Sequence, residues 1–394
     1  MTRSRFLQAP PSGELIPLIE PEIRGNEWKY VKECLETGWV SSAGSFVDRF
    51  ERMVARQCGC RHAVATVNGT AALHVALLVA GVQPHDEVLV SSLTFIAPAN
   101  AIRYVGAWPV FIDAEPEYWQ MDPLRVVEFL EKRCRWSNGA LYNQRTGRRV
   151  TAIVPVHVLG HPVDLDPILT AAQKFGLKVI EDATEGLGAT YRGRPLGSIG
   201  HIGCLSFNGN KIITTGGGGM FVTSNKEWAQ RAKYLTTQAK DDSVEYIHKE
   251  IGYNYRLTNI QAALGCAQME QLDAYVAAKR EIAERYSLAL RDIPGIVPMR
   301  QASWAKSTFW MYTVLIKEEK FGINSRHLLR AFAVQKIQCR PLWQPIHQSP
   351  AHALSRAGEL PVSEQLSKEA LSLPCSVGLS EDAQRKVINQ LCHR

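Results

Sequence analysis

The sequence contains no apolar run long enough to cross a membrane. Its longest run, AALHVALLVAGV, is short and interrupted by a histidine, whereas a membrane-spanning helix needs about 20 consecutive, mostly apolar residues. The first residues, MTRSRFLQAPPSGE, carry arginines but lack the apolar core of a secretory signal. We therefore expect a soluble, unsecreted, cytoplasmic protein with no membrane partner.

The sequence also has few features of a metal-binding or repeat protein. Its 9 cysteines are odd in number and scattered, and only Cys58 and Cys60 lie close together. Because no second close pair completes a metal-ligand spacing, no metal site is predicted and reduced thiols are expected. We find no internal repeat and no low-complexity tract.

The excess of positive charge is modest. The formal net charge is +7, but acidic and basic residues alternate along the chain, so nucleic acid is not singled out as a partner. The densest basic stretch, EKRCRWSNGALYNQRTGRRV at residues 131–150, includes Trp136 and Tyr142. It is typical of a solvated hairpin between two core elements, with an anion-binding or nucleic-acid patch as the alternative.

Seven short β-branched runs alternate with segments of helical periodicity. The apolar positions Leu73, Ala76, Leu77 and Ala80 follow a helical spacing, and residues 167–176 end in a glycine suited to a helix C-terminus. This alternation predicts an α/β fold whose mostly parallel, seven-stranded sheet has helices on both faces. The runs are residues 62–67, 87–92, 109–114, 150–157, 178–183, 204–207 and 220–224.

The chain of 394 residues, 45% of them hydrophobic, is long enough for a large domain and a smaller one. After Arg256 the alternation gives way to a long helix-like run, then the strand-like FWMYTVLIK and a further helix. We predict an N-terminal arm at residues 1–24, a large α/β domain at 25–255 and a small α+β domain at 256–394.

Polar residues follow two of the predicted strands, where ligands of open parallel sheets bind. Gly69 and Thr70 lead directly into an amphipathic helix, whose free N–H groups suit a phosphate; an ordinary strand-to-helix turn is the alternative. Asp182 ends another strand, with Glu185 one helical turn beyond. Asp182 either caps the next turn or meets a buried cation, for which a protonated pyridine nitrogen would serve.

Lys211 stands between the polar segment FNGN and a run of four glycines, in SFNGNKIITTGGGGMFV. The glycines are not followed by Lys-Ser/Thr, so this is not a Walker phosphate loop. Taken alone, the lysine would be interpreted as solvated. Taken together, however, a phosphate cradle, a carboxylate and an amine at three edges of one sheet match the needs of pyridoxal phosphate (PLP).

Five segments carry a resemblance to a known family: NGTAALHVAL, TFIAPANAI, EDATEGLGA, SFNGNKIITTGGGGM and GYNYRLTNIQAAL. In type and spacing they resemble the DegT-type family of PLP-dependent sugar-nucleotide aminotransferases, which have the aspartate aminotransferase fold (type I). Two further segments, GNEWKYVKECLETGWVSSAGSFVDRFE and RPLWQPIH, resemble the subgroup that aminates C4 of UDP-linked 4-keto-6-deoxy amino sugars.

The resemblance implies a role for each matching residue. It makes Lys211 the residue that bonds covalently to PLP, Asp182 the partner of the pyridine nitrogen and Glu185 a neighbour of the phenolic oxygen. It also assigns the phosphate to Gly69, Thr70, Ala71 and Ser206, ring stacking to Phe95, and a phosphate contact from the neighbouring subunit of a homodimer to Asn254. Many members have TTGEGG where this chain has TTGGGG at residues 214–219.

The implied activity is transfer of an amino group, with glutamate as donor, to C4 of a nucleotide-linked sugar used in surface polysaccharide synthesis. The substrate candidates are Trp39, Ser42, His157, Asn208 and Arg340. One alternative is a sugar dehydratase or deaminase, although dehydration in this family accompanies histidine at the position of Lys211. The other is a non-catalytic regulator, which the presence of Lys211 and Asp182 disfavours.

Overall fold

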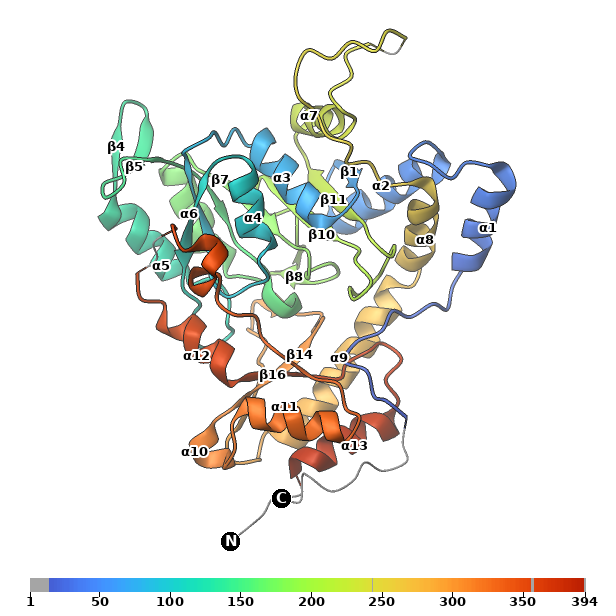
Figure 1. The fold of residues 1–394 in the computed structure, drawn as a ribbon, viewed down its shortest axis with the longest axis vertical. Coiled ribbons are helices and arrows are strands. Elements are labelled where there is room, and N and C mark those ends of the chain that lie inside the picture. Colours follow the sequence, from blue (N-terminus) through green and yellow to red (C-terminus); the bar gives the residue numbers. More distant parts are fainter. Residues whose placement is uncertain (1–13, 243, 356–357, 393–394) are drawn as a thin grey trace.

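The structure, a computed structural model, describes residues 14–242, 244–355 and 358–392. A large sheet forms its centre (Figure 1). The main path of this sheet has the strand order β1-β11-β10-β7-β6-β2-β3. These strands are β1 (His62–Thr66), β2 (Glu87–Ser91), β3 (Trp108–Ile112), β6 (Arg149–Val154), β7 (Lys178–Asp182), β10 (Ile202–Ser206) and β11 (Gly219–Thr223).

The seven strands of this path coincide with the seven predicted runs. β2, β3, β6, β7 and β10 pair in parallel, and β11 runs antiparallel to both of its neighbours, β1 and β10. The prediction of a mostly parallel sheet is therefore confirmed. The parallel direction brings the carboxyl ends of β7 and β10 to the same edge, where Asp182 and Ser206 end their strands.

The sheet has nine strands rather than the predicted seven, because the basic segment adds a hairpin. β4 (Cys134–Ser137) pairs with β5 (Ala140–Asn143), and β5 pairs with the first residues of β6. Asn138 and Gly139 both have positive φ and form the two-residue turn, a preferred hairpin sequence. The hairpin buries Leu141 and exposes Trp136, which confirms the predicted solvated hairpin between two core elements.

Helices cover both faces of the large sheet. Val88 and Val90 of β2 belong to one apolar cluster and Leu89 to the other, because successive side chains of a strand point to opposite faces. The first cluster includes α3 (Gly69–Val79), α4 (Ala97–Tyr104) and α7 (Lys226–Thr236). The second includes α2 (Ser45–Cys58), α5 (Pro123–Glu128), α6 (Leu165–Lys174) and α8 (Asn259–Met269), against which α1 (Glu27–Thr37) packs.

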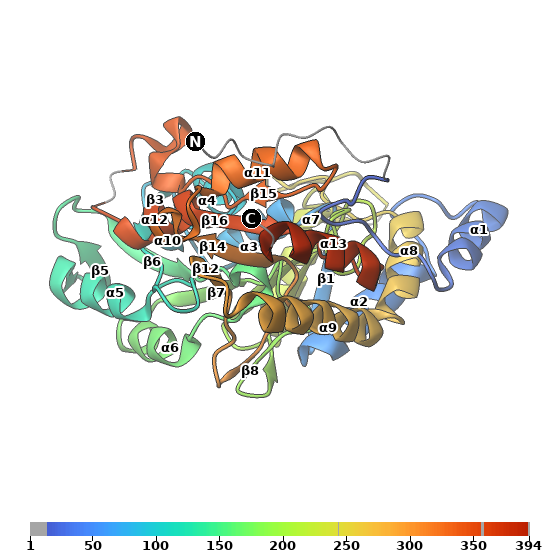
Figure 2. The same ribbon diagram turned by 90° about the horizontal axis from the view of Figure 1, so that it is seen from below.

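The C-terminal part contains a second, antiparallel sheet with the order β12-β14-β16-β15. Its strands are β12 (Ile296–Pro298), β14 (Tyr312–Ile316), β15 (Arg340–Pro341) and β16 (Ala370–Leu373). Figure 2 shows the helices gathered on this part. They are α9 (Leu272–Leu290), α10 (Glu318–Phe321), α11 (Ser325–Val334), α12 (Pro361–Glu369) and α13 (Glu381–Cys392).

Short elements complete the described chain. A third small sheet joins β13 (Ala305–Lys306), β8 (Thr190–Tyr191) and β9 (Arg194–Pro195). Single turns are η2 (Phe129–Arg133), η3 (Val158–Gly160), η4 (Ile346–Gln348) and η5 (Pro350–His352). No helix in the described ranges is both long and apolar enough to span a membrane.

The N-terminal segment attaches to the C-terminal part. Ile16 forms a β-bridge with Ile337, and Leu18 O accepts a hydrogen bond from Cys375 N. Residues 1–13 of the predicted arm lie outside the described residues, and the proposed domain boundaries after residues 24 and 255 stay a prediction.

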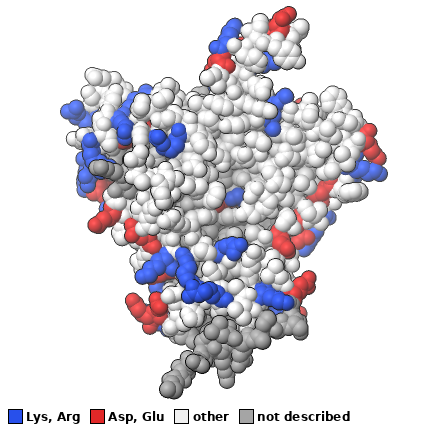
Figure 3. All heavy atoms as spheres, in the orientation of Figure 1, with Lys and Arg blue, Asp and Glu red and all other residues white. Residues whose placement is uncertain are grey.

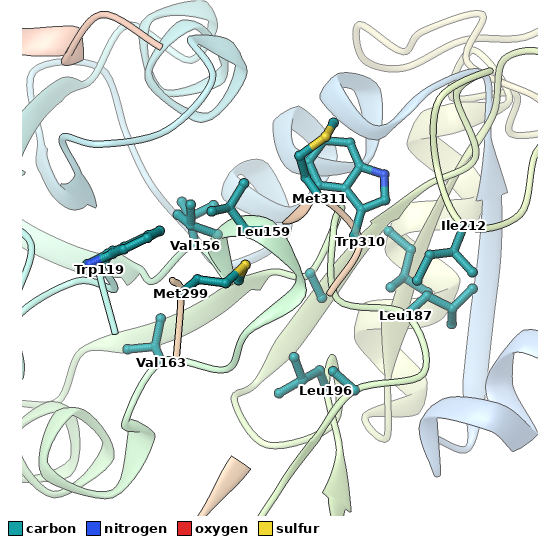
Figure 4. Packing of buried hydrophobic residues seen from close by; sticks show 14 of the residues in the cluster. Trp119, Val156, Leu159, Val163, Leu187, Leu196, Ile212, Met299, Trp310 and Met311 are labelled. Atoms are coloured by element: carbon teal, nitrogen blue, oxygen red, sulfur yellow. The ribbon is translucent and has the colours of Figure 1, made fainter. Parts of the chain in front are cut away.

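Apolar packing joins the second sheet to loops that follow the strands of the large sheet. Figure 4 shows Trp310 and Met311, which precede β14, beside Leu159, Leu187 and Ile212. Because this packing is continuous, the loop that carries Trp310 is held against the carboxyl edge of the large sheet.

Candidate active site

Lys211 follows β10 in a turn closed by the hydrogen bond from its N–H to Asn208 O (3.0 Å). Its side chain is only 14% exposed, and its Nζ lies 3.6 Å from Glu185 Oε1. The Lys211 Nζ also lies 4.1 Å from the centre of the Trp310 ring. Lys211 is thus held by an opposite charge and an aromatic face rather than solvated. The small cavity around it is lined by Thr184, Glu185, Leu187, Ser206, Ile212, Ile213 and Trp310.

Asp182 lies at the carboxyl end of β7 and is 2% exposed. Its Oδ1 accepts a hydrogen bond from Thr184 N (3.2 Å). Burial raises the pKa of Asp182, although the hydrogen bonds from Thr184 and the charge of Lys211 oppose this. A buried carboxylate in this position gains most from a cation placed directly against it.

Glu185 is fixed by the main chain. Its Oε2 accepts a hydrogen bond from Leu159 N (2.8 Å), so its Oε1 is the oxygen nearest Lys211. Leu159 has a positive φ of 61°, which is costly for a leucine. Burial raises the pKa of Glu185; Lys211 and the Leu159 N–H lower it, and the charge of Asp182 raises it further.

The start of α3 offers a place for an anion. Asn68 caps this helix, and its Oδ1 accepts a hydrogen bond from Ala71 N (2.8 Å). The Asn68 side chain occupies the Ala71 N–H in this structure, and the implied phosphate contact of Ala71 stays a prediction. Among the described residues, none accepts a hydrogen bond from the N–H groups of Gly69 and Thr70, which leaves two donors at the positive end of the helix dipole.

Close packing brings this helix start to Ser206. A Cβ built on Gly69 would lie 2.9 Å from Ser206 Cβ and 3.1 Å from Thr184 Cγ2. A Cβ on Gly219 would lie 2.3 Å from Asn68 O, so β11 can begin beside the same turn only with glycine. The helix start, Ser206 and the Lys211 cavity thus adjoin one another. Two free N–H groups, a cavity lysine and a buried carboxylate fit the groups of PLP.

The reason for glycine differs from position to position in the four-glycine run. Gly216 has a φ of +75°, and a Cβ on Gly218 would lie 2.3 Å from Thr215 Oγ1. Gly217 occupies the position of the glutamate in TTGEGG, and the nearest atom to a Cβ there, Gln261 Nε2, lies 3.9 Å away. The departure from the family pattern therefore falls at a position with room for a side chain.

Trp310 belongs to the site but was not predicted. Its indole Nε1–H donates to Asn210 O (2.7 Å), one residue before Lys211, and its ring is 3% exposed. The sequence showed only an apolar run at this position, and nothing local links Trp310 to Lys211. Only the packing of the C-terminal part on the large sheet makes this contact.

His157 is corrected from a substrate candidate to a buried structural residue. Its ring is 0% exposed. Its Nδ1 accepts from Val163 N (3.1 Å), and its Nε2 therefore carries the proton that is donated to Glu181 Oε2 (3.1 Å). Burial raises the pKa of Glu181, but the hydrogen bonds from His157 and from the N–H groups of Gly200 and Gly197 outweigh it and lower the pKa. No ring nitrogen of His157 remains for a sugar.

Trp39 and Ser42 lie in a surface loop that Asn259 holds. Asn259 Nδ2 donates to Trp39 O (2.7 Å) and Asn259 N to Ser41 O (2.6 Å). Ser42 lines a separate cavity of about 270 Å³ together with Lys233 and Arg256. The lining of the Lys211 cavity includes neither Trp39 nor Ser42.

The remaining sequence-predicted residues lie outside the Lys211 cavity. Asn208 is in the turn of Lys211, and its Nδ2 donates to Asn210 Oδ1 (3.1 Å). Phe95 is 56% exposed in the loop between β2 and α4. Asn254 forms a backbone bridge with Thr237. Arg340 lies on β15, and among the described residues no hydrogen bond or ion pair joins it to Lys211.

Residues 21–392 match the sequence pattern of the DegT/DnrJ/EryC1/StrS aminotransferase family. The chain belongs to this family. It is 38% identical to the GDP-perosamine synthase of Caulobacter vibrioides over 379 residues, 95% of this chain and 97% of that protein. It is 37% identical over 382 residues, 96% and 95% of the two chains, to the putative pyridoxal phosphate-dependent aminotransferase EpsN of Bacillus subtilis.

Solved structures agree with this membership. A DegT DnrJ EryC1 StrS aminotransferase from Brucella abortus superposes with a TM-score of 0.85 at 28% identity, covering 93% of this chain and 94% of that one. DesI, solved in the presence of its TDP-sugar product, has a TM-score of 0.87 at 27% identity, covering 98% and 94%. The predicted fold and family are confirmed. The protein is a PLP-dependent sugar aminotransferase.

Proposed function

We propose that this enzyme transfers the amino group of glutamate to C4 of a nucleotide-linked 4-keto-6-deoxy sugar, releasing 2-oxoglutarate and the 4-amino sugar. The observation that carries the proposal is the placement of Lys211 between Glu185 and Trp310, beside Asp182 and the start of α3. Membership of a sugar aminotransferase family supports the reaction class.

The residues that would hold PLP are those at the carboxyl edge of the sheet. The N–H groups of Gly69 and Thr70, with the Ser206 hydroxyl, suit its phosphate, and Phe95 its ring face. Asp182 would meet the pyridine nitrogen and keep it protonated. When bound, PLP accepts electrons from the substrate carbon that loses a proton and carries the amino group from donor to sugar.

Lys211 Nζ would hold the cofactor covalently and, once released, would move the proton. It takes a proton from Cα of glutamate and later delivers one to C4 of the sugar. Glu185 and Trp310 keep the amine in place while it is free, because one offers a carboxylate oxygen and the other an aromatic face. Low exposure around Lys211 keeps bulk water from competing for that proton.

The sequence motifs and the relatives favour different nucleotides for the substrate. The motifs favour a UDP-linked N-acetyl amino sugar, and this stays a prediction. The relatives favour a GDP-linked sugar: the C. vibrioides protein and one from Escherichia coli O157:H7, each 38% identical, are GDP-perosamine synthases. We therefore propose the GDP-linked 4-keto-6-deoxy sugar as the first substrate to test.

We further propose a homodimer whose active sites include Asn254 of the partner. The segment after α7, which leads to Asn254, projects from the molecule in Figure 1. Its apolar side chains Val244, Tyr246 and Ile251 are strongly exposed. Below it, the central part of the face in Figure 3 carries few charged side chains. Exposed apolar side chains such as these three are typical of a surface that another chain covers.

A sugar dehydratase or deaminase remains the chemical alternative, and Lys211 in its cavity favours amino transfer over dehydration. The test is to incubate the purified enzyme with glutamate and each of the GDP-, UDP- and dTDP-linked 4-keto-6-deoxy sugars, and to measure product mass. A 4-amino product from one of them, absent with Lys211→Ala, supports the proposal; a dehydrated product, or none, overturns it. Roles in polysaccharide synthesis and a cytoplasmic location stay predictions.

A further inference from the structure

We propose that Ser92, His347 and Glu364 form a clasp that positions Phe95 against the cofactor ring. The inference rests on the proposed function, because Phe95 is assigned there to the ring face of PLP. His347 and Glu364 come from the C-terminal part of the chain, and Ser92 directly follows β2, the strand beside the edge strand β3 of the large sheet. The clasp is therefore a connection between distant segments rather than a local turn.

The three side chains form a chain of short hydrogen bonds. Ser92 Oγ lies 2.7 Å from His347 Nδ1, and His347 Nε2 lies 3.0 Å from Glu364 Oε1. Ser92 is 0% exposed, and the His347 side chain is 9% exposed. With the ring proton on Nε2, His347 donates to Glu364 and accepts from the Ser92 hydroxyl, so both ring nitrogens are satisfied.

A serine, a histidine and a carboxylate in sequence also occur in hydrolases, but this set does not suit that chemistry. A nucleophilic serine needs access to substrate, whereas Ser92 is fully buried. The cavity around Lys211 includes none of the three residues. The three residues therefore form a structural connection. Its effect on the site depends on the segments that its two ends hold.

At one end, Ser92 is the fixed base of the Phe95 loop. Its N–H donates to Ile112 O (2.9 Å), and its C=O accepts from Ile346 N (2.9 Å). Phe95 follows three residues later, just before α4 begins at Ala97. Because the Ser92 main chain and hydroxyl are all engaged, the loop leaves β2 in one direction.

At the other end, Glu364 is fixed by the first turn of α12. Asp113, after β3, accepts hydrogen bonds from Val362 N (3.1 Å) and Ser363 N (2.8 Å) and so caps this helix from a distance. Asp113 is buried. The start of α12 and the Phe95 loop are therefore attached to the neighbouring strands β3 and β2, and His347 connects the helix to the loop.

The test is a double-mutant cycle on cofactor affinity. The dissociation constant for PLP is measured by tryptophan fluorescence on titrating the cofactor-free protein, and the visible circular dichroism of the bound cofactor reports its orientation. We expect His347→Ala and Phe95→Ala each to weaken PLP binding by about threefold to tenfold. If His347 acts through Phe95, the double variant binds PLP no more weakly than Phe95→Ala alone.

Matched variants separate this role from general loss of packing. Glu364→Gln keeps an acceptor for His347 Nε2 and should retain wild-type affinity for PLP. Glu364→Ala removes that acceptor and should weaken PLP binding. Because Glu364 is more exposed than His347, this change should not prevent folding. His352→Ala removes another histidine of the same segment, which bonds Asn100 instead (3.0 Å), and should leave PLP affinity unchanged. An equal effect of His352→Ala would overturn the proposal.

Other outcomes are equally decisive. Additive effects of His347→Ala and Phe95→Ala would show that His347 acts independently of Phe95. An unchanged affinity in Phe95→Ala would remove both the stacking role and the clasp, while amino transfer by the wild-type enzyme would still stand. If His347→Ala does not fold, the same cycle with Glu364→Ala decides the question.

Discussion

The Nζ of Lys211 lies over the face of Trp310, 4.1 Å from the centre of its ring. Lys211 lies in the loop between β10 and β11 of the large sheet, and Trp310 lies in the segment that enters the second sheet. The amine is therefore in its position only when the C-terminal part is packed on the carboxyl edge of the large sheet. Binding of cofactor and stability of this packing should depend on each other.

Lys211→Ala should abolish the visible absorbance of the lysine-bound cofactor and essentially all amino transfer, because none of the other residues lining the cavity is an amine. The protein should still fold, since the change removes a single charged side chain from a cavity edge. Absorption spectra and the mass-based assay check this. Retained turnover with a normal lysine-bound spectrum would falsify the assignment.

Asp182→Asn should slow amino transfer by orders of magnitude, because a neutral amide does not keep the pyridine nitrogen protonated. The same change should stabilise the cofactor-free protein at pH 8, since each unit by which burial raises the pKa corresponds to about 1.4 kcal/mol. The amide oxygen still accepts from Thr184 N, so the local hydrogen bond is kept.

The sign of this stability effect depends on pH. Burial raises the pKa of Asp182 in the folded protein, so the folded state binds the proton more tightly than the unfolded state. Stability is therefore lost as pH rises from the ordinary aspartate pKa through the raised one, and the Asp182→Asn variant has no such loss. Thermal midpoints of the two proteins should diverge as pH rises from about 4; a constant or reversed difference contradicts the prediction.

Gly69→Ala should weaken PLP binding by at least about tenfold and lower the thermal midpoint. The added methyl would lie 2.9 Å from Ser206 Cβ and 3.1 Å from Thr184 Cγ2, so the start of α3 must shift away from the site. Gly209→Ala is the matched control in the Lys211 turn, where the nearest atom would be 3.9 Å away. Equal losses in both variants would argue against a steric cause.

Mixing Lys211→Ala and Asn254→Ala chains tests the shared active site. If Asn254 serves the partner, a mixed dimer has one site with both defects and one with neither. With random pairing, half of the dimers are mixed, so roughly a quarter of wild-type activity should return. Limiting PLP makes the Asn254→Ala defect visible, because loss of one hydrogen bond to a charged group is worth about 1.5 to 3 kcal/mol.

The control for this experiment is formation of the mixed dimer, checked with differently tagged chains. Activity no higher than the sum of the parents, in dimers shown to be mixed, would mean that each site is built within one chain. The cross-subunit role of Asn254 would then be wrong, and amino transfer by Lys211 would be unaffected.

The main strands could be predicted because their residues are buried on both faces and therefore read as continuous β-branched runs. Lys211, Asp182 and Gly69 could be found for a related reason, since each follows or ends such a run. The hairpin strands β4 and β5 escaped the strand count because their four-residue, partly exposed sequences lack that pattern.

Residues that act through distant contacts could not be predicted. Trp310 and His347 are each separated from their partners, Lys211 and Ser92, by long stretches of sequence. His157 shows the converse error: it follows a strand at the functional edge, yet its hydrogen bond to buried Glu181 turns it inward. Spacing locates the edge of a sheet, but only packing decides which side chains face a ligand.

The hairpin of β4 and β5 joins the first residues of β6, at the amino ends of the parallel strands, whereas Lys211 and Asp182 gather at their carboxyl ends. Its two-residue turn at Asn138 and Gly139 has open space beside it, since a Cβ on Gly139 would have no atom within 4 Å. An affinity tag or a fluorescent peptide spliced into this turn would therefore label the enzyme on the side opposite its chemistry.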